Sequence, residues 1–143
     1  MNAELARVSF LSSSHFLLAG IGLENDGIDA TLPAARELHQ TATLRDERGN
    51  VAWLEHLLGD LAMGSEPADI SAAAAHYRAA ATIADELGMR PLAMECHFGL
   101  GAVARREDRE AEAQSEFRSA LKLAQDMSIV AAADKAGQQL QAT

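Results

Sequence analysis

Cys96 and His97 are the adjacent pair whose side-chain types could do nucleophilic chemistry. An imidazole beside a thiol can remove the thiol proton and generate the reactive thiolate. The surrounding sequence, MECHFGLGAV, is typical of a helix, however, and neighbouring helical residues point about 100 degrees apart. We therefore expect Cys96 to be a small buried residue and His97 to be partly packed, and we predict no catalytic residues.

The remaining histidines do not predict a metal site. His15, His39, His56 and His76 show no H-x-x-x-H or H-E-x-x-H spacing, and a single cysteine offers no C-x-x-C pair. The glycines of LLAGIGLENDG match neither a P-loop nor a G-x-G-x-x-G fingerprint. We therefore expect no metal and no cofactor.

Composition and charge limit the partners and the compartment. The chain has 143 residues, 12 Lys plus Arg against 21 Asp plus Glu, and a formal net charge of -9, which repels nucleic acid and anionic lipid. It has no apolar run of the roughly 18 residues that a membrane helix needs, and VSFLSSSHFLLAGIGL is too interrupted to predict a signal peptide. The lone cysteine fits a reducing compartment, so we expect a cytoplasmic protein.

Three segments repeat the same pattern of small and large residues. AAREL at Ala34, AAAHY at Ala73 and AQSEF at Ala113 are 39 and 40 residues apart. The fifth residue of each is large, and small and then apolar residues follow at helical spacing: Leu38, Thr41 and Leu44; Tyr77, Ala80 and Ile83; Phe117, Ala120 and Leu123. A helix with one packed face is predicted at each segment.

A second helical segment with a glycine precedes each of these helices. The glycines are Gly20, Gly59 and Gly101, at offsets of 39 and 42 residues. Glycine inside a helix costs about 1 kcal/mol relative to alanine. Its recurrence therefore predicts that a large side chain of the partner helix packs closely against it.

Turn-rich segments divide the chain into helical hairpins. The segments ENDGIDATLP, GSEPADIS and RREDRE lie inside the pairs, and DERGN, ELGMRP and DMS separate them. We therefore predict an all-α domain of three hairpins, at about 10–48, 49–88 and 89–127, and a capping helix over 128–141. The apolar residues of that helix, expected to face the last hairpin, are Ile129, Val130, Ala133, Ala136 and Leu140.

The repeats resemble the tetratricopeptide repeat (TPR) family, whose pattern is Leu-Gly in the first helix followed by Ala, an aromatic and Ala in the second. The third repeat carries Leu100-Gly101, Ala113, Phe117 and Ala120; the second carries Leu58-Gly59, Ala73, Tyr77 and Ala80; the first carries Ala19-Gly20, Ala34, Leu38 and Thr41. Phe16, Glu55 and His97 replace the family's early Trp. The length of 39 to 42 exceeds the usual 34 or so and is similar to the long bacterial repeats of signalling ATPases and transcriptional regulators.

This resemblance implies a right-handed α-solenoid that binds a protein or peptide non-catalytically in a concave groove lined by the first helices. The implied groove residues are Trp53, His56, Asp60, Met63, Glu95, Phe98, Ala102, Arg105 and Arg106 in the second and third repeats, and Ser14, Leu17, Ile21, Glu24 and Asn25 in the first. Arg105 and Arg106 favour an acidic or carboxylate-terminated ligand segment.

Several alternatives stay open at this point. The chain could be the sensor or regulatory part of a larger signalling ATPase or transcription regulator. It could instead be a small-molecule binder or an enzyme with a pocket near Trp53, His56 and Cys96. Trp53 could also be buried between hairpins rather than in the groove. The solenoid ends could mediate homo-oligomer formation.

Overall fold

A computed structural model describes residues 28–141 of the chain, and within that range it contains helices and no strands. The six helices are α2 (Ile28–Leu44), α3 (Arg48–Gly64), α4 (Ile70–Leu87), α5 (Arg90–Arg106), α6 (Glu110–Asp126) and α7 (Val130–Gln141). The all-α prediction is confirmed. The predictions for residues 10–27, including Gly20 and the groove positions of the first repeat, lie outside the described residues.

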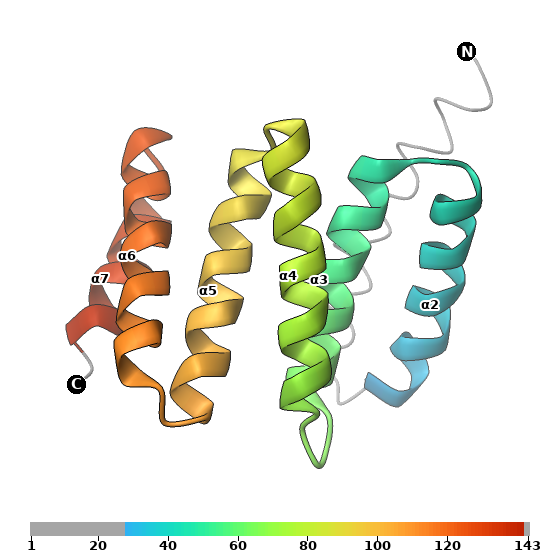
Figure 1. Cartoon of the computed structure of the whole chain (residues 1–143), viewed down its shortest axis with the longest axis horizontal. Helices are drawn as coiled ribbons and strands as arrows, with labels where there is room; N and C mark the ends of the chain where they lie inside the picture. Colours follow the sequence, from blue (N-terminus) through green and yellow to red (C-terminus); the bar gives the residue numbers. More distant parts are fainter. Residues whose placement is uncertain (1–27, 142–143) are drawn as a thin grey trace.

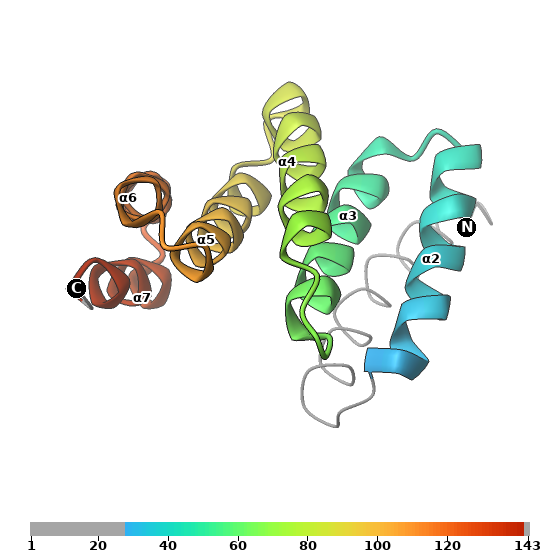
Figure 2. The same cartoon turned by 60° about the horizontal axis from the view of Figure 1, so that its bottom comes forward.

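Consecutive helices run antiparallel and stand side by side in chain order, with α2 at one end of the row and α7 at the other (Figures 1 and 2). Each helix packs against the next one, and α3 also contacts α5. Contacts of this kind link near neighbours in the sequence, as expected for stacked hairpins. Between residues 28 and 141, no helix combines the length and the apolar character needed to cross a membrane.

Four of the five connections between these helices use the same tight turn, which is two or three residues long. In each turn one residue has a left-handed backbone conformation, with φ between 55° and 68°: Asp46, Gly88, Asp108 and Ser128. The next residue donates its backbone N–H, at 2.8 to 2.9 Å, to a buried alanine five positions earlier: Ala42, Ala84, Ala104 and Ala124. This is the Schellman geometry, which satisfies carbonyls at a helix C-terminus and turns the chain sharply.

The connection between α3 and α4 differs because it is longer, at residues 65–69. Asp69 ends it by accepting a hydrogen bond from the backbone N–H of Ala72 at 3.1 Å, which caps the first turn of α4. A turn in this hairpin loop was the prediction from the sequence GSEPADIS.

Two aromatic side chains pack against helical glycines in the interior. A Cβ atom on Gly59 of α3 or on Gly99 of α5 would lie 2.7 Å from the Tyr77 ring, and one on Gly101 would lie 2.8 Å from the Phe117 ring. Tyr77 and Phe117 are each 3% exposed. The prediction that Gly59 and Gly101 face large side chains is confirmed. Only glycine, which lacks a Cβ atom, leaves room for the two rings at these positions.

The buried face of α2 corrects the register expected for the first repeat. Ala34, Leu38 and Thr41 are only partly buried, whereas the fully packed positions of this helix are Thr31, Ala35 and Ala42. Ala42 accepts the turn hydrogen bond that Ala84 accepts in α4, so the two helices align at an offset of 42 residues rather than 39. In that alignment the small Ala35 stands where α4 has Tyr77. The first repeat therefore lacks the large side chain on which the sequence alignment of the repeats was based.

The structure also corrects two local predictions. Helix α2 already begins at Ile28 and contains Pro33, so the second half of ENDGIDATLP is helix rather than turn. Burial of the Thr31 and Ala35 face outweighs the hydrogen bond that proline removes. In the C-terminal segment α7 forms as predicted, but Val130 is 72% exposed. Ile129 packs on the core instead, because adjacent residues cannot share one direction.

Candidate functional site: a groove between α3, α5 and α7

A groove of about 480 Å³ opens between α3, α5 and α7, and side chains of α4 and α6 contribute to its floor. We call it the α3–α5–α7 groove. Eight of the nine predicted groove residues of the second and third repeats line it: His56, Asp60, Met63, Glu95, Phe98, Ala102, Arg105 and Arg106. The exception is Trp53. The α3 residues and the α5 residues of this set lie close together because α3 and α5 contact each other directly.

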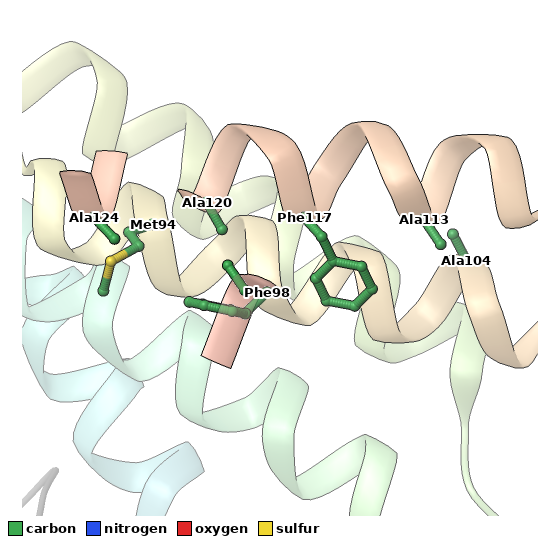
Figure 3. Packing of buried hydrophobic residues seen from close by; sticks show 8 residues of the cluster. Met94, Phe98, Ala104, Ala113, Phe117, Ala120 and Ala124 are labelled. Carbon is green, nitrogen blue, oxygen red and sulfur yellow. The ribbon is translucent and has the colours of Figure 1, made fainter. Parts of the chain in front are cut away.

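The floor of the groove is apolar and rigid. Phe98 of α5 and Phe117 of α6 lie with ring centroids 6.3 Å apart, and both belong to one buried cluster (Figure 3). Tyr77 reaches the floor from α4, where it lies between Gly59 and Gly99. Such tightly packed rings offer a preformed surface on which an apolar side chain of a ligand can rest.

The α3 wall of the groove carries a hydrogen-bonded carboxylate. The Tyr77 hydroxyl donates to Asp60 Oδ1 at 2.6 Å, and His56 Nδ1 lies 3.5 Å from Asp60 Oδ2. Burial of the phenol, together with the charge of Asp60, raises the pKa of Tyr77 far above its usual value. Tyr77 therefore stays a neutral donor that fixes the orientation of Asp60.

Arg105 uses its donors inside the fold. Its Nε and Nη2 atoms donate to the two carboxylate oxygens of Glu110 at 3.2 and 2.8 Å, and Nη1 and Nη2 donate to the side chain and backbone of Gln139 at 2.8 and 3.0 Å. The guanidinium also lies 4.9 Å from the Phe117 ring centroid. Arg105 thus joins α5 to α6 and α7 across the edge of the groove, and the predicted bidentate contact to a ligand would have to replace these bonds.

The α7 wall was missed by the sequence reasoning. Lys135 and Gln139 line the groove, and the Lys135 ammonium lies 4.3 Å from the Phe98 ring centroid. The signal was present in the sequence: counting from the helix starts at Arg90 and Val130, Lys135 occupies the position of Glu95. The sequence predicts a capping helix here, with no groove residue assigned to it.

Trp53 and Cys96 lie away from the groove floor. Trp53 packs, partly buried, against a cluster of small and apolar residues from α3, α4 and α5, with its ring 6.3 Å from His56. Cys96 belongs to the same cluster and is fully buried. Of the three residues proposed for a small-molecule or catalytic pocket, only His56 lines the groove.

The environments of Cys96 and His97 argue against a nucleophilic pair. Burial of the thiol, reinforced by the charges of Asp60 and Glu95, raises the pKa of Cys96 to about 12, so the thiolate is not populated near neutrality. His97 points to α6, where its Nδ1 lies 2.6 Å from Glu116. The two side chains thus serve different contacts, as expected from their adjacent helical positions.

A second polar cluster lies outside the groove and links α3 to α2 and α4. Glu55 lies 2.7 Å from His39 of α2 and 2.6 Å from His76 of α4, each imidazole nitrogen facing a different carboxylate oxygen. The bridge between His97 and Glu116 repeats the contact between Glu55 and His76 one hairpin later, with the two residue types exchanged. These bridges tie neighbouring helices together. Among the described residues, no group of three or more histidine, cysteine or acidic side chains is arranged to hold a metal ion.

Comparisons of the chain with protein-family models, with curated proteins and with solved structures find no match. The interpretation of the groove therefore depends on its own residues and their geometry.

Proposed function

We propose that this protein is a non-catalytic binding module that holds a short segment of another protein in the α3–α5–α7 groove. The observation that carries the proposal is the combination of an apolar aromatic floor with charged groups at the rim, in a groove formed by three helices. An apolar floor supplies burial and charged rims supply selectivity, which is the anatomy of protein interfaces.

We further propose that the row of hairpins is a TPR-like solenoid and that the groove is its concave side. Three observations support this arrangement. The turns between hairpins repeat, the glycines of α3 and α5 accommodate an aromatic ring of the following helix, and α3 contacts α5. In such a stack the first helices of successive hairpins lie side by side and form one continuous surface.

A non-catalytic role is supported by the state of the titratable groups in and near the groove. Tyr77 and Cys96 have pKa values raised by burial, and so neither is a base or nucleophile near neutral pH. The Tyr77 hydroxyl donates to Asp60 and so holds that carboxylate in one orientation. These groups fit a packed and charged binding surface better than an acid and base pair.

Selection of random dodecapeptides displayed on phage tests this proposal. The wild-type protein should enrich a family of peptides, and a variant with the groove filled, Ala102→Trp, should lose them. Ala75→Trp is the matched control, because Ala75 is exposed on α4 and does not line the groove. Circular dichroism would confirm that both variants fold. Enriched peptides that bind equally to Ala102→Trp would show that the groove is not the binding site.

A further inference from the structure

Helix α5 carries charges of opposite sign towards the two ends of its face in the α3–α5–α7 groove. Asp60 lines the groove from α3, and Glu95 lines it from the second turn of α5. Lys135 lies on the α7 wall, and Arg106 is the last residue of α5. The negative net charge of the chain hides this local separation.

The positions of Glu95 and Arg106 on α5 set the distance between these opposite charges. Glu95 and Arg106 are 11 residues apart, which is three helical turns, so both side chains lie on the same face at a spacing of about 16 Å. Both line the groove, and Phe98 and Ala102 lie between them on that face. An extended chain rises about 3.3 Å per residue, so about five residues of a bound segment would span this distance.

The two end charges are available to a ligand. Among residues 28–141, Glu95 and Arg106 make no hydrogen bond or ion pair with another side chain, unlike Arg105, whose donors are directed at Glu110 and Gln139. Arg106 is exposed and Glu95 is partly exposed. A charged partner at either end would therefore not have to displace an internal bond.

We propose that the segment bound in the groove is dipolar: an extended stretch with a basic side chain near Glu95, an acidic side chain about five residues away near Arg106, and an apolar side chain between them on the Phe98 floor. This inference rests on the proposed function and replaces a purely acidic ligand with one of opposite charges at its two ends. Opposite charges placed at fixed separation select both the partner and its direction.

The same phage selection provides the first test. Peptides enriched by the wild-type protein should carry a Lys or Arg and an Asp or Glu four to six positions apart. Glu95→Arg should weaken the Kd of a selected peptide at least about tenfold, and replacing the basic residue of that peptide by Glu should restore the affinity. The reciprocal pair is Arg106→Glu with the acidic peptide residue changed to Lys. Glu37→Arg and Arg118→Glu, which change exposed residues outside the groove, are the controls and should leave the Kd unchanged.

The possible results distinguish the dipolar ligand from groove binding in general. Rescue by the matching peptide charge supports the dipolar ligand, because a merely structural defect in the protein would not be repaired by changing the peptide. Selected peptides that lack the paired charges, or a loss without rescue, would overturn the dipolar ligand and leave groove binding intact. If no enriched peptide depends on the groove, as judged by Ala102→Trp, both proposals are wrong.

Discussion

At the scale of single residues, the contact between glycine and an aromatic ring decides how closely the helices approach. Tyr77 fits between Gly59 and Gly99, and its hydroxyl is held by Asp60, so the ring cannot move away from an added methyl group. Phe117 is held against Gly101 by the same cluster that contains Phe98. The floor of the groove therefore depends on glycines that would be unfavourable in an isolated helix.

Substituting these glycines tests that dependence. Gly59→Ala and Gly101→Ala should each lower the free energy of unfolding by about 1 to 3 kcal/mol, because the new Cβ overlaps a buried ring. Gly137→Ala is the matched control in α7: a Cβ there has no atom within 4 Å, so the substitution should be neutral or stabilise by up to about 1 kcal/mol. Urea denaturation measures all three. Equal effects at Gly59 and Gly137 would contradict the packing.

Cys96 provides a residue-scale prediction about pH. Its thiol is fully buried, and burial raises its pKa from the ordinary 9.0 to about 12, so the folded state keeps the thiol proton between these values while the unfolded state loses it. The contribution of Cys96 to stability is thus present below pH 9 and is lost as pH rises toward 12. At pH 8 iodoacetamide should label Cys96 only after unfolding in urea, as measured by mass spectrometry. Rapid labelling of the folded protein would contradict its burial.

At the scale of the elements, one kind of turn forms four of the five connections between the described helices and so sets their antiparallel packing. The left-handed residue is a glycine only at position 88, and Asp46, Asp108 and Ser128 adopt the same conformation at some cost. The buried alanine that accepts the turn hydrogen bond also packs on the neighbouring helix. Turn geometry and helix packing are therefore coupled through one small residue.

Exchanging residues at these turns tests the coupling. Ser128→Gly should stabilise the protein by about 0.5 to 1 kcal/mol, because glycine adopts a positive φ without the steric cost of a Cβ. Gly88→Ala should destabilise it by a similar amount although no atom lies within 4 Å of the added Cβ, since φ there is 68°. Thermal and urea unfolding report both changes. A neutral result at both positions would show that the turns do not fix the helices.

At the scale of the whole molecule, α7 completes both the core and the groove. It contributes Ala136, which is fully buried, and its Ala132, Ala133 and Leu140 pack on the cluster around Phe117, as does Ile129, which directly precedes it. It also supplies Lys135 to the groove wall and Gln139 to Arg105. A stack of repeats needs such a cover at its end, because the last hairpin would otherwise expose its apolar face.

Removing residues 128–143 should therefore have two effects. The truncated chain should self-associate through the uncovered face of α6 around Phe117 and Leu121, which light scattering coupled to size-exclusion chromatography would detect. It should also lose the groove-dependent peptides. The point variant Lys135→Ala, on an exposed side chain, separates the two effects because it should affect the peptides alone. A truncated chain that stays monomeric and as stable as the parent would show that α7 is dispensable.

Much of the fold and of the groove could be predicted from the sequence, because the relevant signals are local. The repeated Ala, aromatic and Ala positions of α4 and α6 determine which face of each helix is buried, and Gly59 and Gly101 indicate where the rings fit. The TPR resemblance implies which α3 and α5 residues line the groove, and their spacing places those of each helix on one face.

The tertiary structure alone decided the rest, because it depends on which neighbour each side chain meets. The local sequence does not indicate that Ala35 aligns with Tyr77. The register of α2 follows from the burial of Ala35 and from the turn hydrogen bond to Ala42. Arg105 and Arg106 are equivalent in the sequence, yet Glu110 and Gln139 approach one and not the other. The side chain of Lys135 reaches the groove because α7 packs beside α5 and α6, and distant partners of this kind are not encoded in any local pattern.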